Sequence, residues 1–367
     1  MKSELAESIL KVVMNKWDVN KLTEELKDLQ IISEIKYDDY QQYTHGMRYV
    51  ESLALWLRQF DDFKDRELAY KLVKTKLLYV SEEEMRQLVE FAFQIAMKKY
   101  LLEKTKEFCI DNSILDIKER ECVYKCLMRM TLFLGLSDGA HTDFFRRQNP
   151  ELSNEQVFVH YDFSKSKSID MLEELKEDNL IKKFNNKRCI LTPEFSTYFL
   201  IDDFSASGKS YIRYDGKEWR GKIPKFFKQL SEIEYKKENI EIHLILYLAT
   251  KKSIEYIQKE AQAYFENNNV KITIDAIQIV EHLDLDNEID IENLLIKNYE
   301  KYKKEINYND KHFKKGGGKK PYRGFADCSL FLVIYHNTPN NSLPILWYSC
   351  VALTDALFPR VSRHKEA

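Results

Sequence analysis

The sequence predicts an α/β protein in which an all-helical N-terminal domain precedes an open, mostly parallel sheet. Two observations lead to this fold class. Apolar residues recur at helical spacing over residues 1–134, and short, continuous apolar runs alternate with helical segments over residues 136–285. Continuous apolar strands separated by helices are typical of a parallel sheet that is covered on both faces. We therefore expect a helical domain at residues 1–134 and an α/β domain with a C-terminal extension at residues 135–367.

The first 134 residues are expected to be helical throughout. Ala6, Leu10 and Val13 fall on one helix face, and residues 78–91 continue the same spacing around a capping signal that begins at Ser81. Helices of this kind bury apolar stripes against each other, so we expect a bundle. Helical periodicity alone indicates a scaffold or a partner-docking surface and selects no partner.

The α/β region contains five candidate strands. In chain order they are residues 157–161, 188–191, 197–201, 240–248 and 270–280. The segments between them, residues 169–180, 226–233 and 253–265, show helical spacing. A further strand is expected at residues 329–335, beyond a basic, glycine-rich loop.

Composition narrows the class of protein. The chain has 57 basic and 59 acidic residues, so its net charge gives no global attraction to nucleic acid. Six scattered cysteines without a C-x-x-C pair fit a reducing cytosol. No apolar run approaches the length of a membrane span, and the N-terminus has no signal-peptide core. We expect a cytoplasmic protein without membrane contact, and the absence of H-E-x-x-H or paired His/Cys spacing argues against zinc.

The strongest signal for chemistry is the segment at residues 198–210, Tyr-Phe-Leu-Ile-Asp-Asp-Phe-Ser-Ala-Ser-Gly-Lys-Ser. Four apolar residues form a strand, Asp202 and Asp203 follow at its carboxyl end, and a small-residue loop leads to an expected helix. Ligands of open α/β sheets bind outside the carboxyl ends of strands. Small residues let backbone N–H groups surround a phosphate, and the serine hydroxyls add donors. Adjacent carboxylates suit ribose hydroxyls or Mg²⁺ beside a diphosphate.

Two other interpretations of this segment stay open. Gly208-Lys209-Ser210 matches the end of a P-loop, but that motif requires glycine where Asp203 stands. The segment is also compatible with a strand, an acidic turn and a capped helix that carry no function, because short motifs match by chance.

The same segment resembles the phosphoribosyl-diphosphate-binding motif of the type I phosphoribosyltransferases. Asp202 and Asp203 match the two acids of that motif, Ser207-Gly208 stands for its Thr-Gly, and Ser210 for its last Thr. The resemblance implies that Asp202 and Asp203 are catalytic and hold Mg²⁺ indirectly. It also implies a phosphate-binding loop made of Ser205, Ala206, Ser207, Gly208, Lys209 and Ser210. Lys209 is atypical of the motif and offers an additional phosphate contact.

The order of elements extends the resemblance over residues 136–285. Residues 157–161 would be the first strand, and the motif strand the third. The loop after the first strand, residues 162–168, would then lie where the family binds the diphosphate. It is rich in Ser and Lys, which makes Lys165 and Lys167 candidate anion ligands.

Two flanking stretches, residues 137–147 and 337–347, are similar to the phosphoribosyltransferase-like effectors of bacterial antiphage defence systems, some of them encoded beside a retron reverse transcriptase. The similarity implies a toxin effector that depletes a metabolite or modifies a target, with a reverse transcriptase–nucleic acid complex as possible partner. Arg146 and Arg147 carry forks that suit a phosphate. The alternative for both is a surface ion pair with Glu151 or Glu155.

The implied chemistry is the departure of a diphosphate from ribose C1 through an oxocarbenium-like state, with Mg²⁺ and loop cations stabilising the leaving charge. The enzyme would be a glycosyl transferase or would cleave a nucleotide. The alternative is a non-catalytic nucleotide sensor or a partner-binding subunit on the same fold. The sequence leaves the acceptor and the oligomeric state open.

Three further stretches each allow more than one interpretation. The basic residues 311–323 form either a lid over an anionic substrate, or a nucleic-acid contact, or a solvated loop. Residues 337–344 either close the mouth of the site or form a turn between core strands. The acidic residues 281–292 lack the glycine of a calcium loop and are best interpreted as a solvated turn.

Overall fold

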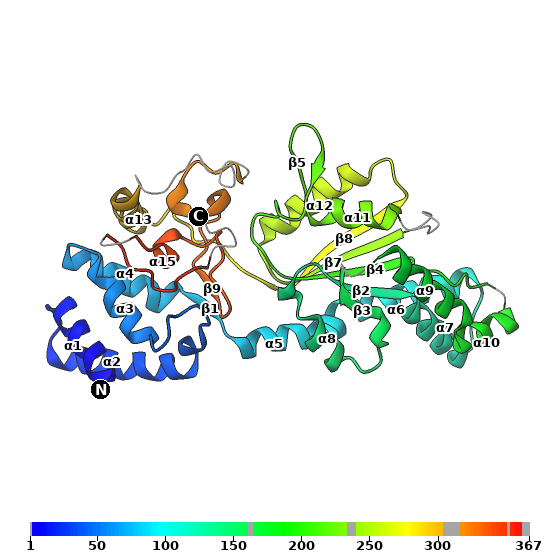
Figure 1. Ribbon diagram of the computed structural model, residues 1–367, viewed down its shortest axis with the longest axis horizontal. Coiled ribbons are helices and arrows are strands. Elements are labelled where there is room, and N and C mark those ends of the chain that lie inside the picture. The colour runs from blue at the N-terminus through cyan, green and yellow to red at the C-terminus, as the bar shows by residue number, and fades with distance from the viewer. Residues whose placement is uncertain are drawn as a thin grey trace. The chain divides into compact units, whose positions relative to one another are not determined.

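The structure, a computed structural model, describes residues 2–160, 164–188, 190–232, 240–303, 316–350 and 353–361. The chain divides into two compact units (Figure 1). The first comprises Met1–Met85 together with Glu281–Ala367, and the second comprises Arg86–Val280. This division differs from the boundary expected near residue 134, because the helices after residue 91 pack on the sheet and the end of the chain returns to the N-terminal helices.

The second unit is built on a five-stranded sheet in the order β3-β2-β4-β7-β8. Every neighbouring pair in it is parallel. Its strands are β2 (Thr131–Gly135), β3 (Val157–Val159), β4 (Thr197–Ser205), β7 (Ile240–Ala249) and β8 (Val270–Ile279). The expected open, parallel α/β sheet is therefore confirmed.

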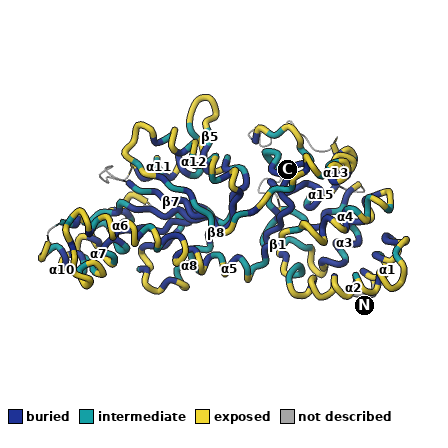
Figure 2. The backbone as a smooth tube through the Cα atoms, turned by 180° about the vertical axis from the view of Figure 1, so that it is seen from behind, coloured by how far each residue is buried: buried dark blue, intermediate teal, exposed yellow. Residues whose placement is uncertain are grey.

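Helices cover both faces of this sheet, as the buried central strands in Figure 2 illustrate. On one face, Tyr198 and Leu200 of β4 join a large apolar cluster with Phe226 of α11 and Ile257 of α12. On the other face, Phe199 stacks on Phe133 with ring centroids 5.3 Å apart. The helical elements of the unit are η2 (Ala92–Met97), α6 (Lys98–Asp111), α7 (Ile117–Arg129), η3 (Asp138–Ala140), α8 (Thr142–Gln148), η4 (Asn154–Gln156), α9 (Lys165–Glu177), α10 (Asn179–Arg188), α11 (Lys222–Glu232) and α12 (Lys251–Phe265).

One strand of this unit was missed, and one predicted strand is absent from the described residues. Residues 131–135 were expected to be helical but form β2, which lies between β3 and β4. All five residues of β2 are buried, and periodicity does not separate so short an apolar run from a buried helix. Residues 188–191 were expected to be a strand, yet α10 continues to Arg188, and Ile190 and Leu191 have no regular structure.

The first unit is formed by two ranges that are far apart in the chain, Met1–Met85 and Glu281–Ala367. Its main elements are α1 (Lys2–Val13), α2 (Val19–Ile35), η1 (Tyr37–Asp39), α3 (Tyr49–Arg58), α4 (Phe63–Lys76), β1 (Leu78–Val80), α13 (Ile289–Tyr302), η6 (Pro321–Arg323), η7 (Phe325–Asp327), β9 (Leu332–Ile334) and α15 (Pro344–Trp347). β1 pairs in parallel with β9, so residues 78–80, expected to be helical, form a strand instead. Their hydrogen-bonding partner lies about 250 residues later, which no local pattern encodes.

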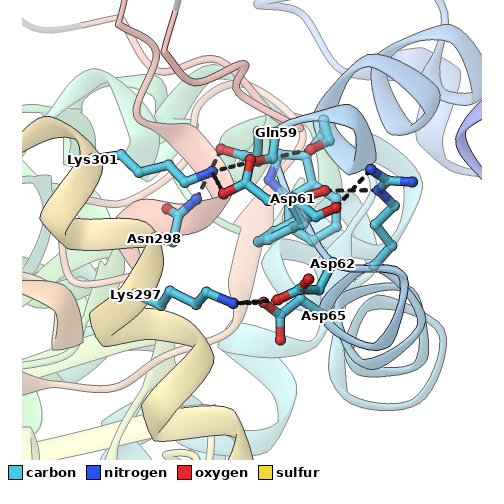
Figure 3. Close-up of polar contacts among 10 residues, drawn as sticks. Gln59, Asp61, Asp62, Asp65, Lys297, Asn298 and Lys301 are labelled. Atoms are coloured by element: carbon cyan, nitrogen blue, oxygen red, sulfur yellow. Dashed lines mark hydrogen bonds and ion pairs between the residues drawn. The ribbon is translucent and has the colours of Figure 1, made fainter.

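Within this unit, side chains of α13 contact the segment between α3 and α4 and the first turn of α4 (Figure 3). Lys297 contacts Asp62 at 2.8 Å and Asp65 at 2.5 Å. Asn298 donates to the Oε1 of Gln59 at 3.0 Å, and Lys301 pairs with Asp61 at 2.9 Å. These contacts join residues that are more than 230 positions apart in the chain.

The capping signal at Ser81 is present as expected. The Oγ of Ser81 accepts from the backbone N–H of Glu84, while the Glu84 carboxylate accepts from the backbone N–H of Ser81. This reciprocal pair begins α5 (Glu82–Phe91), which runs across the division between the units. Within the described ranges, no helix has the length and apolar character needed to cross a membrane.

Candidate functional site

The strand order places a topological switch point, where the crevice of an open α/β sheet is expected, at the carboxyl ends of β2 and β4. Counted along the chain, the five strands of the sheet lie in the order 2-1-3-4-5, so the direction of winding reverses between β2 and β4. Ligands of open α/β sheets bind at such a switch point. The segments that leave these two strands there are residues 136–141 and residues 206–210. The sequence motif therefore lies at the position that the topology favours.

The two acids of the motif lie inside the strand and not after it. β4 continues to Ser205, because its partner β7 is long enough to pair with it as far as Ala249. Successive side chains of a strand point to opposite faces. Asp202 consequently lies on the side of Leu200 and α11, whereas Asp203 lies on the side of Phe199. The expectation that Asp202 and Asp203 follow the strand as adjacent carboxylates was therefore wrong, because both belong to β4 and point to opposite faces.

Asp202 is fully buried and its oxygens are occupied. The Oδ1 atom accepts from the hydroxyl of Ser137, and the Oδ2 atom accepts from the Tyr211 hydroxyl at 2.7 Å and from the ammonium of Lys222. Burial raises the pKa of Asp202, and the charge of Lys222 opposes that rise while the neighbouring Asp203 adds to it. Asp202 thus acts as the centre of an internal network.

A hairpin that the sequence did not predict brings Lys222 to Asp202. A helix was expected directly after the motif, but a hairpin of β5 (Arg213–Tyr214) and β6 (Trp219–Arg220) intervenes before α11 begins at Lys222. The carbonyls of Ser210 and Tyr211 accept from the N–H groups of Lys222 and Ile223, which fixes the start of α11 against the motif. No spacing rule points to Lys222, and sequence reasoning missed it.

Asp203 is partly exposed and lies against the segment after β2. A Cβ atom built on Gly139 would lie 2.6 Å from the Oδ2 of Asp203, so the glycine lets the backbone approach the carboxylate in its present position. The other carboxylate oxygen accepts from the backbone N–H of Phe204 at 2.9 Å. The carbonyl of Ala140 accepts from the buried Tyr247 hydroxyl at 2.6 Å, which holds residues 137–141 in place.

The loop at residues 206–210 is anchored through its carbonyls. The carbonyls of Ser205 and Ala206 accept from Ser253 and Thr250, at the start of α12. Gly208 has a φ of +73°, and a Cβ there would lie 2.7 Å from the Tyr256 ring, so the tight turn requires glycine.

The donors of this loop are unused. Within the part of the chain that the structure describes, the backbone N–H groups of residues 206–210 donate no hydrogen bond. The buried hydroxyl of Ser205 also has no hydrogen-bond partner there. Consecutive unused N–H groups in a tight turn form a concavity that suits an anion. Lys209 lies beside this turn with its ammonium 5.8 Å from the Tyr256 ring.

His160 is a second residue that the sequence did not single out. It follows β3, and its Nδ1 lies 3.3 Å from the carbonyl oxygen of Gly135 at the end of β2. Burial lowers the pKa of His160, and the charge of Lys222 lowers it further. Both effects favour the neutral form of the imidazole.

The other predicted anion ligands lie at the start of α9 and in the last turn of α8. Lys167 places its ammonium 4.0 Å from the Phe158 ring, and both Lys165 and Lys167 lie in the first turn of α9. Arg147 forms a long ion pair with Asp143 at 3.9 Å, and neither it nor Arg146 contacts the motif among the described residues. The loop before α9 includes Asp162 and Phe163, which lie outside the described residues.

The basic stretch at residues 311–323 and the acidic stretch at residues 281–292 form ion pairs with each other. Arg323 contacts Asp286 at 2.6 Å and Glu292 at 2.5 Å, and Lys320 also contacts Glu292. The described part of the basic stretch and the acidic stretch thus form ion pairs within the first unit. Lys311, Lys314 and Lys315 lie outside the described residues.

No ready metal centre accompanies the motif. Among the residues that the structure describes, no three His, Cys, Asp or Glu side chains are grouped so that they would hold a metal ion. Asp202 pairs with Lys222, and Asp203 is the partly exposed carboxylate of the two.

The comparison with protein families agrees with this geometry. The PRTase-CE family pattern matches residues 53–360, which is most of the chain. The chain belongs to the PRTase-CE family. The phosphoribosyltransferase-like fold that the motif indicated is thereby confirmed, and the match extends well beyond residues 136–285. The PRTase-CE region begins within α3 and includes both β1 and β9, so it draws on both compact units. The comparisons with curated proteins and with solved structures give no match.

Proposed function

We propose that this PRTase-CE protein binds phosphoribosyl diphosphate or a related nucleotide at the carboxyl ends of β2 and β4. The observation that carries the proposal is the row of N–H groups at residues 206–210, which donate no hydrogen bond within the described ranges and lie at the switch point directly after the acidic strand end. Backbone donors in a glycine turn recognise phosphate oxygens without a net charge of their own. Lys209 and the hydroxyls of Ser205, Ser207 and Ser210 would add contacts to the same group.

Asp203 would accept hydrogen bonds from the ribose hydroxyls, because it is the exposed member of the acidic pair. Mg²⁺ fits this arrangement as an ion that arrives with the diphosphate, since Mg²⁺ commonly uses one or two carboxylates and completes its shell with phosphates and water. When bound, it would neutralise charge on the leaving diphosphate. The chain's own contribution would be to orient the ribose and to hold the diphosphate with pre-placed donors.

The finer biological role is also a proposal. The flanking stretches at residues 137–147 and 337–347 support an effector of bacterial antiphage defence, acting in the cytoplasm beside a retron-type reverse transcriptase complex. The five described cysteines are free thiols, in keeping with that compartment. The reaction would transfer a phosphoribosyl group or cleave a nucleotide.

A non-catalytic nucleotide sensor is the second candidate. This candidate is favoured by the ion pair between Asp202 and Lys222, because Asp202 then does not contact the ligand. Incubation with phosphoribosyl diphosphate and Mg²⁺, followed by detection of released diphosphate, separates the two. Turnover that disappears in Asp203→Asn supports the enzyme, whereas tight binding without any turnover supports the sensor.

Calorimetry tests the binding site itself. We expect wild-type protein to bind phosphoribosyl diphosphate with Mg²⁺, and Asp203→Asn to bind it about tenfold or more weakly, as expected for a lost hydrogen bond to a charged group. The control is Lys228→Met, which removes an exposed charge from α11 away from the motif. Equal affinity of wild type and Asp203→Asn would contradict the assignment.

A further inference from the structure

Lys222 is an ammonium group that is mostly buried and only partly satisfied. Its side chain is 27% exposed, it donates to the Oδ2 of Asp202, and it lies 5.0 Å from the centroid of the Tyr211 ring. An ammonium has three donors. Among the residues that the structure describes, Lys222 has no further hydrogen-bond partner, so donors remain available at the exposed end of the group.

Asp202, in contrast, is shielded from a ligand by its burial and by its three donors. Its carboxylate is 0% exposed and receives hydrogen bonds from Ser137, Tyr211 and Lys222. These donors come from the segment after β2, from the motif turn and from α11, so the carboxylate joins the elements that surround the crevice. Asp203 points to the opposite face of β4 and has a different environment.

We infer that Lys222 is the cation that receives a phosphate oxygen of the ligand at this crevice, and that Asp202 positions Lys222 and does not touch the ligand. The inference rests on the proposed function, since it assigns a different role in that site to each of the two acids. Asp203 meets the ribose, while the Asp202–Lys222 pair presents a positive charge beside the N–H groups of residues 206–210.

The charge balance supports this division. A diphosphate would be repelled by two free carboxylates at the end of β4. The pairing with Lys222 neutralises Asp202 within the protein, and the carbonyls of Ser210 and Tyr211 hold the start of α11 against the motif turn. These hydrogen bonds hold Lys222 next to the segment that supplies the backbone donors. Its ammonium would there balance the negative charge of a bound phosphate.

The test titrates inorganic pyrophosphate into the full chain by calorimetry at low salt. We expect Lys222→Met to weaken binding about tenfold or more, as for a lost charged hydrogen bond. Lys222→Arg, which keeps the charge, should bind within a few-fold of wild type, and so should Lys228→Met, the matched control on the same helix. Asp202→Asn keeps an oxygen for Lys222 and should bind pyrophosphate as well as wild type or better.

A charge-neutral double variant, Asp202→Asn with Lys222→Met, protects the test against misfolding, because it leaves no buried charge unpaired. It should lose pyrophosphate binding as Lys222→Met does. The inference is overturned if wild type does not bind pyrophosphate, if the folded Lys222→Met or double variant binds it like wild type, or if Lys222→Arg loses as much affinity as Lys222→Met.

The outcomes also separate this inference from the proposed function. Pyrophosphate binding that depends on Lys222, without any binding of phosphoribosyl diphosphate, would retain the inference and refute the proposed ligand. Binding of phosphoribosyl diphosphate that depends on Asp203 but not on Lys222 would do the reverse. Loss of phosphoribosyl diphosphate binding in Asp202→Asn, with pyrophosphate binding intact, would show that Asp202 touches the ribose and would overturn its positioning role.

Discussion

The ammonium of Lys222 donates to the fully buried carboxylate of Asp202, which lies 20 residues earlier in the chain. A buried ion pair costs desolvation energy, but removing one partner leaves a charge without compensation. The Asp202–Lys222 ion pair therefore contributes to the stability of the fold. The same pair also fixes the arrangement of side chains at the proposed binding site.

Substitution of Asp202 by leucine should therefore destabilise the protein by about 3 kcal/mol, because Lys222 keeps its charge beside an apolar group. The double variant Asp202→Leu with Lys222→Met should cost clearly less than Asp202→Leu alone. Urea unfolding of both variants measures the difference in the free energy of unfolding. Equal destabilisation of the single and double variants would show that the pair is not coupled.

The motif turn should reject a side chain at Gly208. Alanine there adds the strain of a positive φ to a clash with Tyr256 and Ile257, so we expect a loss of about 2 kcal/mol or more. Gly216 in the β5–β6 hairpin is the matched control, since it has a φ of +92° but no atom within 4 Å of an added Cβ. Gly216→Ala should cost about 1 kcal/mol. Thermal or urea unfolding compares them, and similar costs would refute the predicted clash.

The buried His243 should make the protein sensitive to acid. It lies between the rings of Tyr100 and Phe199 and contacts the Oγ1 of Thr273 at 2.7 Å. Burial lowers the pKa of His243 to about 4 from its usual 6.5, so the folded state keeps it neutral while the unfolded chain takes up a proton. Its contribution to stability is complete above pH 6.5 and is lost as the pH falls from 6.5 towards 4.

The expected loss from His243 is on the order of 3 kcal/mol across that pH range, at about 1.4 kcal/mol per pKa unit. The free energy of unfolding of wild type and of His243→Gln, measured between pH 4 and 7, isolates this share from that of the carboxylates. Parallel pH curves for the two proteins would mean that His243 does not titrate in this way.

The contacts between α13 and the α3–α4 segment should differ in strength. Lys297 is exposed, so Lys297→Ala should cost less than about 1 kcal/mol despite its two carboxylate partners. Asn298 is buried and donates to Gln59, so Asn298→Ala should leave that amide oxygen unsatisfied and cost about 1–3 kcal/mol. Urea unfolding in high and low salt tests both, and a larger loss for Lys297→Ala would contradict the argument.

Much of the fold was predictable because the strands of the sheet are buried. The apolar runs around Leu200, Ile245 and Ile274 predict strands, and the helices between them follow from their spacing. Two strands were missed. β1 and β2 are short strands whose partners lie far along the chain or whose apolar run is too brief to distinguish strand from helix.

The candidate site was predictable in position but not in detail. Gly208 and the small residues around it indicate a phosphate-binding turn, and the topology places that turn at the switch point. The sequence does not reveal that Asp202 and Asp203 point to opposite faces, because that depends on how far β7 pairs with β4. Lys222 and His160 could not be identified, since tertiary contacts alone bring them to the crevice.

The most direct test of the account is calorimetric titration of phosphoribosyl diphosphate with Mg²⁺ into wild-type protein and into Asp203→Asn, with Lys228→Met as control. We predict binding to wild type and to the control, and affinity lower by about tenfold or more in Asp203→Asn. Absence of binding to folded wild-type protein at any Mg²⁺ concentration, or equal binding to Asp203→Asn, would contradict the assignment of this crevice as a phosphoribosyl site.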